Sequence, residues 1–132
     1  MSAKNQPHPM FHSGAWFNLA AGAPFLLVPA FVSQLMGIPT TAGNYLFMQM
    51  FGMAVIGFGW VYWLIAREPE RFRPLIMVGL LLKIGVVLLV YIYWWLGIIG
   101  WILPALAFGD VIYSVLFLRY LRQNRHALAS EA

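Results

Sequence analysis

Residues 73–122 of the chain read RPLIMVGLLLKIGVVLLVYIYWWLGIIGWILPALAFGDVIYSVLFLRYLR, which is two long apolar runs joined by a short turn. Away from the ends of these two runs, the only charged residues are Lys83 and Asp110. Lys83 lies ten residues after Arg73, and Asp110 lies twelve residues before Arg122. At about 1.5 Å per residue, antiparallel helices would place them roughly 15 and 18 Å from the same surface. Opposite charges at matched depth predict a buried ion pair between the two helices.

The composition is that of a membrane protein. Of the 132 residues, 62% are hydrophobic and 9% are charged, whereas about a quarter of the residues in a soluble domain are charged. Four apolar runs each have about the 20 residues needed to cross a hydrocarbon core. We therefore expect an all-α integral membrane protein, a four-transmembrane-helix bundle with helices at about residues 15–36, 45–66, 74–96 and 101–121. A polar N-terminal segment, residues 1–14, and a C-terminal tail, residues 122–132, would flank this single domain.

The basic residues alternate between the ends of the predicted helices. They occur near the amino terminus, in the second connection and near the carboxyl terminus, as Lys4, Arg67, Arg71, Arg73, Arg119, Arg122 and Arg125. The first connection, residues 37–44, and the third, residues 97–100, carry no charged residue. The positive-inside rule then predicts that both termini are cytoplasmic. The net charge of +4 reflects orientation and contact with membrane lipids, and nucleic-acid binding is not expected.

Prolines and polar residues in the first run predict a distorted helix. Pro24 and Pro29 each free a backbone carbonyl about one turn earlier, so a kink is expected. In lipid, such a carbonyl needs a partner from a neighbouring helix. Asn18 could donate to one, and we interpret it as a link between helices rather than as a catalytic residue.

The second run carries a stripe of small residues. Gly52, Gly59 and Ala66 recur every seven residues, and Gln49 lies one turn before Gly52. Such a stripe allows another helix to pack closely. The partner helix would belong to the same bundle or to a second copy of the chain in a homo-oligomer.

The second connection is the most polar part of the predicted membrane domain. It reads REPERFRP over residues 67–74, and its charged residues are Arg67, Glu68, Glu70, Arg71 and Arg73. Exposed ion pairs of this kind are individually worth little. The connection is therefore either a tight cytoplasmic turn that contacts lipid phosphates or a docking site for a partner.

Polar residues of the fourth run share one helix face. Asp110, Tyr113 and Ser114 have three- and four-residue spacings, which predict a polar stripe that faces the inside of the bundle. Gly79 lies one turn before Lys83 and would remove bulk beside its ammonium group. The candidate polar centre comprises Lys83, Asp110, Tyr113, Ser114, Asn18 and Gln49, and it either binds a ligand or fixes the helices against one another as a structural ion pair. The aromatic residues Trp60, Tyr62 and Trp63 are interpreted instead as part of an interfacial belt.

Signals for metal or enzyme chemistry are weak. His8 and His12 have a spacing that can bind a metal on a helix, but Pro9 between them argues against a helix there. The sequence has no metal-ligand cluster, nucleophile elbow or glycine-rich phosphate loop. It also has no cysteine, which excludes disulfides and thiolate chemistry. We assign no metal, no cofactor and no catalytic residue.

Several short motifs are spread over residues 17–122, namely Phe17-Asn18, Gly22, Phe25, Pro29, the REPER turn, Lys83 and Gly109-Asp110. Together they resemble small bacterial four-helix membrane proteins of a loosely DoxX-like kind. The resemblance implies a four-helix fold in the bacterial inner membrane, and it implies no particular activity. The chain differs from small multidrug-resistance transporters because its first run has no acidic residue.

Three functional hypotheses follow from these observations. The first is a non-enzymatic protein that binds a lipophilic small molecule or a larger membrane complex around the buried pair. The second is a membrane enzyme that transfers a proton to or from a lipid-like substrate at Asp110. The third is a small proton-coupled transporter. Intramembrane ionisable residues are candidates for each of these functions.

Overall fold

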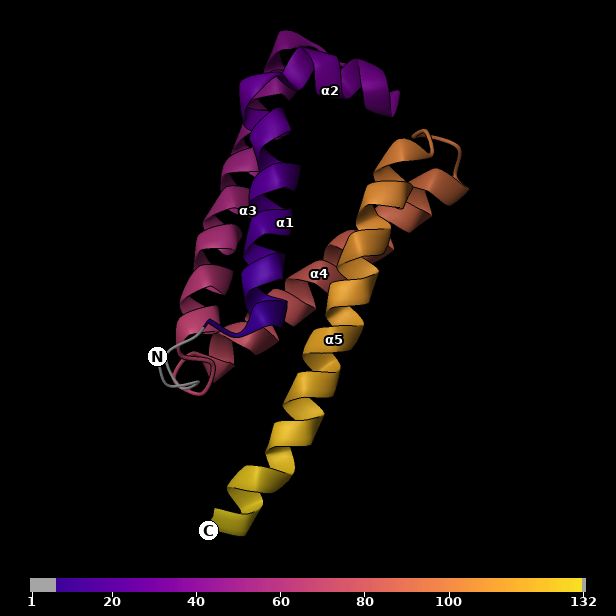
Figure 1. Ribbon diagram of the computed structural model, residues 1–132. Coiled ribbons are helices and arrows are strands. Elements are labelled where there is room, and N and C mark those ends of the chain that lie inside the picture. Colours follow the sequence, from indigo (N-terminus) through magenta and orange to yellow (C-terminus); the bar gives the residue numbers. More distant parts are fainter. Residues whose placement is uncertain (1–6, 132) are drawn as a thin grey trace.

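The computed structural model describes residues 7–131, and the side chains of residues 7–124. This part of the chain forms five helices and no strand, which confirms the all-α prediction. The helices are α1 (Pro9–Leu27), α2 (Pro29–Met36), α3 (Ala42–Arg67), α4 (Arg73–Trp95) and α5 (Ile102–Glu131), as Figure 1 shows.

Three helices are long and apolar enough to cross a membrane: α3, α4 and the part of α5 from Ile102 to Asn124. A fourth crossing results if α1 and α2, which are bent by 106° at their junction, are taken as one broken span. With 19 residues, α1 alone is about 28 Å long. The structure therefore supports three or four spans.

The first helix begins earlier than predicted. It starts at Pro9 rather than near residue 15, so the second half of the expected N-terminal segment is helical. Pro9 occupies the first helical position, where its missing N–H needs no partner, and it therefore starts the helix rather than preventing one at His12. Phe11 is completely buried, and the N–H of His8 donates to the carbonyl of Ala66 at 2.7 Å. Burial of Phe11 and this bond fix the start of α1 against the end of α3.

The predicted kink is a full break, and it lies at one proline only. Helix α1 continues through Pro24 and ends at Leu27, and Val28 then adopts a non-helical conformation (φ −136°, ψ 57°) before Pro29. The side-chain amide of Gln49 donates to the carbonyl of Leu26 at 3.1 Å, which provides a partner at the interrupted end of α1. Beyond the break, α2 lies across one end of the bundle (Figure 1).

Glycines bring α1 and α3 into close contact along their length. A methyl group on Gly52 would lie 2.8 Å from the carbonyl oxygen of Gly22, and one on Gly59 would lie 3.2 Å from that of Ala15. The small-residue stripe of α3 is therefore covered by α1, as predicted for packing inside the bundle. Gly52, Gly59 and Ala66 are buried within the chain, so a homo-oligomer, which stays a prediction, would have to use another surface.

The two ends of the bundle differ. We call the end that carries the turn between α3 and α4 the basic end, and the opposite end, with α2 and residues 96–101, the distal end. At the basic end all four long helices meet in one apolar cluster, which includes Phe11, Tyr62, Ile76 and Phe117. At the distal end a smaller cluster around Phe25, Val32 and Met36 joins α2 to the start of α5.

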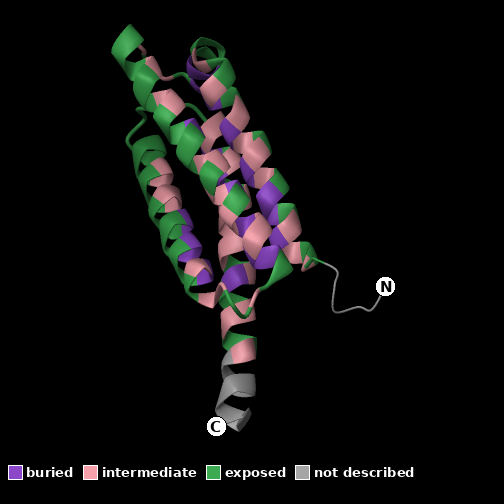
Figure 2. Cartoon of the chain, turned by 90° about the vertical axis from the view of Figure 1, so that its left-hand side faces the viewer, coloured by how far each residue is buried: buried purple, intermediate pink, exposed green. Residues whose placement is uncertain are grey.

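Between these two clusters the α1/α3 pair and the α4/α5 pair separate. The buried residues of α4 all lie in its first half, namely Ile76, Gly79, Leu80 and Lys83, and the rest of the helix is exposed or intermediate (Figure 2). Beyond the basic end, α5 continues as a helix to Glu131. The tail predicted to begin at residue 122 is thus a continuation of α5, not a separate segment.

The α1/α3 contact gives a first prediction. Replacing Gly52 with alanine should lower the melting temperature in detergent, because the new methyl group would clash with backbone atoms of α1. The same change at Gly57, which has nothing within 4 Å, should be neutral or raise stability by up to about 1 kcal/mol through helix propensity. Equal melting temperatures for the two variants would show that the close approach is not required.

Candidate functional site

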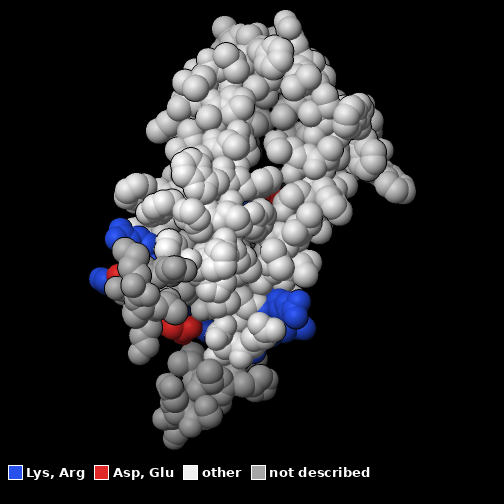
Figure 3. Space-filling view, viewed as in Figure 1, with Lys and Arg blue, Asp and Glu red and all other residues white. Residues whose placement is uncertain are grey.

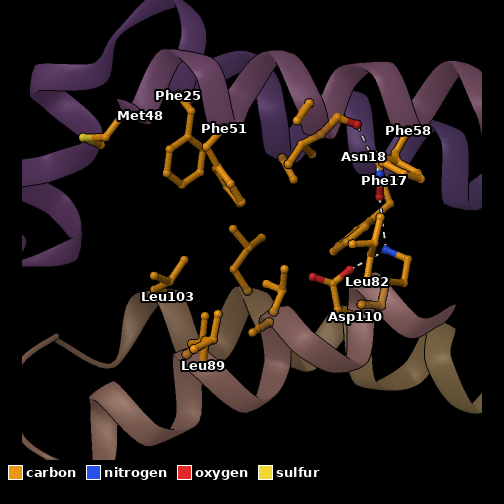
Figure 4. A pocket seen from close by; sticks show the side chains of 18 of the residues that line it. Phe17, Asn18, Phe25, Met48, Phe51, Phe58, Leu82, Leu89, Leu103 and Asp110 are labelled. Atoms are coloured by element: carbon orange, nitrogen blue, oxygen red, sulfur yellow. Dashed lines mark hydrogen bonds and ion pairs between the residues drawn. The ribbon is translucent and has the colours of Figure 1, made fainter. Parts of the chain in front are cut away.

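A cavity lies between the two helix pairs and has a volume of about 580 Å³, within the usual range for ligand pockets. Helices α1, α3, α4 and α5 all contribute to its lining. Its walls are mainly aliphatic and aromatic, with five phenylalanines, Phe17, Phe25, Phe47, Phe51 and Phe58. The polar residues Asn18, Tyr62, Lys83 and Asp110 also line it, and Figure 4 shows Asn18 and Asp110 at one end.

The predicted ion pair is present at that end. The ammonium Nζ of Lys83 lies 2.5 Å from Oδ1 of Asp110, and it also donates to Oδ1 of Asn18 at 3.2 Å. Only 6% of the Lys83 side chain is exposed. The predicted pairing is therefore confirmed. The rise per residue of the two helices was enough to match Lys83 with Asp110, which is 27 residues away in the sequence.

Asn18 connects three helices. Its oxygen accepts from Lys83 on α4, and its amide nitrogen donates to the carbonyl of Val55 on α3 at 3.2 Å. The prediction that Asn18 links helices is confirmed, although its backbone acceptor is on α3 rather than at a carbonyl freed by proline. Because its amide group is used on both sides, Asn18 holds the Lys83 ammonium at a fixed distance from α3.

Aromatic rings surround the remaining side of the ammonium group. The centroids of Phe17, Tyr62 and Tyr113 lie 5.7, 5.3 and 5.7 Å from Nζ, distances at which ring faces attract a cation. Assigning Tyr62 to an interfacial belt was wrong, because this residue is only 1% exposed. Sequence reasoning thus missed two residues of the site, Phe17 and Tyr62.

Two glycines admit these rings. A methyl group on Gly79 would lie 2.8 Å from the hydroxyl of Tyr62, and one on Gly109 would lie 2.6 Å from the ring of Phe17. Gly79 therefore removes bulk for Tyr62 rather than for the ammonium group itself. Gly79 lies one turn before Lys83, and Gly109 lies directly before Asp110. In the sequence, these two glycines were the signal that large side chains pack beside the pair.

Asp110 is only half used by the protein. Its Oδ1 is paired with Lys83, whereas no N–H or O–H group among residues 7–124 donates to Oδ2. The Asp110 side chain is 21% exposed and lines the cavity. Figure 4 shows one carboxylate oxygen of Asp110 joined by a dashed line and the other directed toward the part of the cavity where Leu89 and Leu103 lie. In Figure 3, acidic atoms are visible in a hollow of the upper part of the face, which is otherwise uncharged, whereas the other charged side chains gather on its lower part.

Three other predicted residues of the polar centre do not line the cavity. The hydroxyl of Tyr113 donates to Oγ of Ser13 at 3.0 Å, so only its ring contributes to the site. Ser114 donates to the backbone carbonyl of Asp110 within its own helix at 2.7 Å. Gln49 is bonded to the carbonyl of Leu26 at the break after α1.

The charged turn lies at the basic end and fastens α4 to α5. Arg71 pairs with Glu68 at 3.2 Å, but both side chains are more than half exposed, so the pair contributes little. Arg73 donates to the carbonyl of Leu121 at 3.0 Å, and Glu70 accepts from the hydroxyl of Tyr120 at 3.1 Å. Arg67 is exposed. None of these residues lines the cavity between the helix pairs.

Comparisons with known proteins add no relative. No family model, curated protein or solved structure matches the chain. The function is therefore inferred from the geometry of the cavity and its polar end.

The buried pair gives a second prediction. Lys83→Met or Asp110→Leu alone should destabilise the fold by up to about 3–5 kcal/mol, because each leaves one buried charge unpaired. The double variant should recover most of the loss in melting temperature, measured in detergent. Glu68→Ala serves as the control, since its exposed pair with Arg71 should change stability by less than about 1 kcal/mol. A double variant no more stable than the single ones would contradict simple pairing.

The ring cage gives a third prediction. Gly79→Ala should displace the phenol of Tyr62 from above Lys83, because the added methyl would lie within 3 Å of its hydroxyl. The matched control on the same helix is Gly85→Ala, at a position with nothing within 4 Å. We expect a shift in the tyrosine ultraviolet absorption and a lower melting temperature for Gly79→Ala, and neither change for Gly85→Ala. Unchanged spectra in both would show that Tyr62 adapts without cost.

Proposed function

We propose that this is a small membrane protein that binds a lipophilic ligand, without enzymatic activity, in the cavity between its two helix pairs. The observation that carries the proposal is an apolar cavity of about 580 Å³ that contacts the Lys83–Asp110 pair at one end. A cavity with apolar walls and a few convergent polar groups is the usual form of a site for an amphiphilic small molecule.

The proposed membrane arrangement has four spans, with both termini on the cytoplasmic side of a bacterial inner membrane. Its support is the charge distribution: Arg67, Arg71 and Arg73 lie at the basic end, and the distal connections carry no charged residue. The positive-inside rule then assigns the basic end to the cytoplasm. The short motifs that resemble loosely DoxX-like proteins agree with this arrangement.

Access from the surrounding lipid favours a lipophilic ligand. Phe47 on α3 and Leu89 on α4 line the cavity, yet they are 69% and 60% exposed. They therefore belong to an opening between the two helices, at the level where apolar helix surfaces would face hydrocarbon chains. A molecule dissolved in the membrane can enter through this side without crossing water. Helices of a larger membrane complex could contact the same opening from outside. Membrane lipids and such partner helices would then compete with the ligand for this opening.

The geometry gives less support to an enzyme. Tyr113, one turn after Asp110 on the same helix, is the phenol that could act with Asp110 in proton transfer. Its hydroxyl is bonded to Ser13 instead, and Tyr113 is not among the residues that line the cavity.

A proton-coupled transporter is also weakly supported. Transport would need a polar path from the cavity to both surfaces. On the side of the basic end, the Lys83 region is followed by the cluster of Phe11, Tyr62, Ile65 and Phe117, each at most 1% exposed. Such tightly packed apolar side chains exclude water and would have to move in every cycle.

The cavity can be tested by filling it. Ala21 lines the cavity, whereas its neighbour Ala20 is exposed and does not. Ala21→Phe should abolish retention of a lipophilic molecule during purification in mild detergent, while Ala20→Phe should retain it as the wild type does. Native mass spectrometry and mass spectrometry of organic extracts would measure the retained molecule, and circular dichroism would check that both variants are folded.

Two results would count against the proposal. One is an equal amount of bound molecule in the two folded variants, which would place the ligand outside the cavity. The other is a wild-type protein that binds no lipophilic compound, either from the membrane or when compounds are added.

A further inference from the structure

The ammonium group of Lys83 is mostly enclosed by side chains of the protein. An ammonium has three N–H donors. One faces Asp110 and one faces Asn18, and the rings of Phe17, Tyr62 and Tyr113 lie 5.3–5.7 Å from Nζ on its other sides. A phosphate or carboxylate head group would have to displace Asp110 or Asn18 in order to reach Nζ.

The polar end of the cavity is balanced in charge. The single positive charge of Lys83 faces the single negative charge of Asp110, and among residues 7–124 no other charged side chain lines the cavity. An anionic or cationic ligand would bring an uncompensated charge into an apolar space, which is strongly unfavourable. The site is therefore suited to a neutral ligand.

The one unsatisfied polar atom of the pair is an acceptor. Oδ2 of Asp110 receives no hydrogen bond from residues 7–124 and is directed into the cavity (Figure 4). A carboxylate oxygen accepts hydrogen bonds and donates none, and leaving it without a partner in an apolar environment is costly. A ligand O–H would satisfy it with a charge-assisted bond, which is about twice as strong as a neutral one.

The apolar part of the cavity extends from this oxygen toward the distal end. On α1 its walls run from Phe17 to Phe25, and on α5 from Asp110 to Leu103, which are distances of about 12 and 10 Å along the helices. A tail of this length can lie between the helix pairs with its head at Asp110.

We propose that the ligand is a neutral amphiphile with an apolar tail and one hydroxyl group, an aliphatic alcohol or a phenol, whose O–H donates to Oδ2 of Asp110. This inference rests on the proposed function, because it names the chemical class of the molecule that the cavity binds. Lys83 then acts as a positioning residue that holds Asp110 through Oδ1 and leaves Oδ2 free.

The test is a titration of the full chain in detergent with probes that share one tail. These are dodecanol, dodecyl methyl ether, dodecanoate and dodecylamine, with apparent Kd values measured by native mass spectrometry. Dodecanol should bind at least about tenfold more tightly than the ether, because the ether cannot donate the bond to the carboxylate. Dodecanoate and dodecylamine should also bind more weakly than dodecanol. Dodecylphenol, titrated in parallel, distinguishes a phenol from an aliphatic alcohol as the preferred head group.

Three variants serve as controls. The Lys83→Met/Asp110→Leu double variant keeps the cavity but lacks the acceptor, so it should bind dodecanol and the ether equally. Tyr62→Phe keeps the ring and removes the only other hydroxyl that lines the cavity, and it should preserve the preference for dodecanol. Ala21→Phe should bind none of the probes.

The outcomes separate this inference from the proposed function. Equal binding of dodecanol and the ether by the wild type, with loss of both in Ala21→Phe, would overturn the hydroxyl inference and leave the cavity as a lipophilic site. Tightest binding of dodecanoate would show that Lys83 binds the head group, and loss of the preference in Tyr62→Phe would assign it to Tyr62. Probes that bind Ala21→Phe as well as the wild type would overturn both proposals.

Discussion

The arrangement of the helices depends on the ammonium group of Lys83, which is removed from water in the middle of an apolar bundle. The effective penalty for burying such an ion is several kcal/mol, even after the protein relaxes. Each of the other long helices supplies part of the compensation: Asp110 from α5, Asn18 from α1 and the ring of Tyr62 from α3. The first half of α4 must therefore stay close to all three, and the packing at the basic end satisfies this requirement.

Glycines make the convergence sterically possible. Gly22 and Gly52 bring the backbones of α1 and α3 together, and Gly79 and Gly109 leave room for the rings that cover Lys83. Beyond the pair, α4 has no buried residue, so it diverges from α3 while α2 bridges the distal end. The cavity is the space between a fixed polar contact at one end and a fixed apolar contact at the other.

This origin of the cavity explains why its polar end has an unusual composition. The protein surrounds the positive charge of Lys83 with oxygen acceptors and ring faces, both of which stabilise an ammonium group. Within residues 7–124, it provides a partner for only one of the two oxygens of Asp110. The carboxylate has two oxygens on a short side chain, and the lysine can meet one of them while the other remains on the cavity side. A structural ion pair and a site for a hydrogen-bond donor are thus combined in the same two residues.

Much of the fold could be predicted from the sequence. Hydropathy and run length determined the all-α class and the apolar helices, because a backbone in lipid must satisfy its own hydrogen bonds. The constant rise of a helix determined the depth of Lys83 and Asp110, and the seven-residue spacing of Gly52 and Gly59 indicated a face for close packing. These are properties of single helices, and they need no knowledge of the neighbours.

The tertiary structure decided what each helix does with its neighbours. It placed the break at Val28 rather than at Pro24, bonded Gln49 to Leu26, and directed the hydroxyl of Tyr113 to Ser13. It also brought Phe17 and Tyr62 over Lys83 and left Oδ2 of Asp110 facing an open cavity. None of this follows from periodicity, because the same polar side chain can bond to any helix within reach, and the space that remains unfilled depends on how four helices pack together.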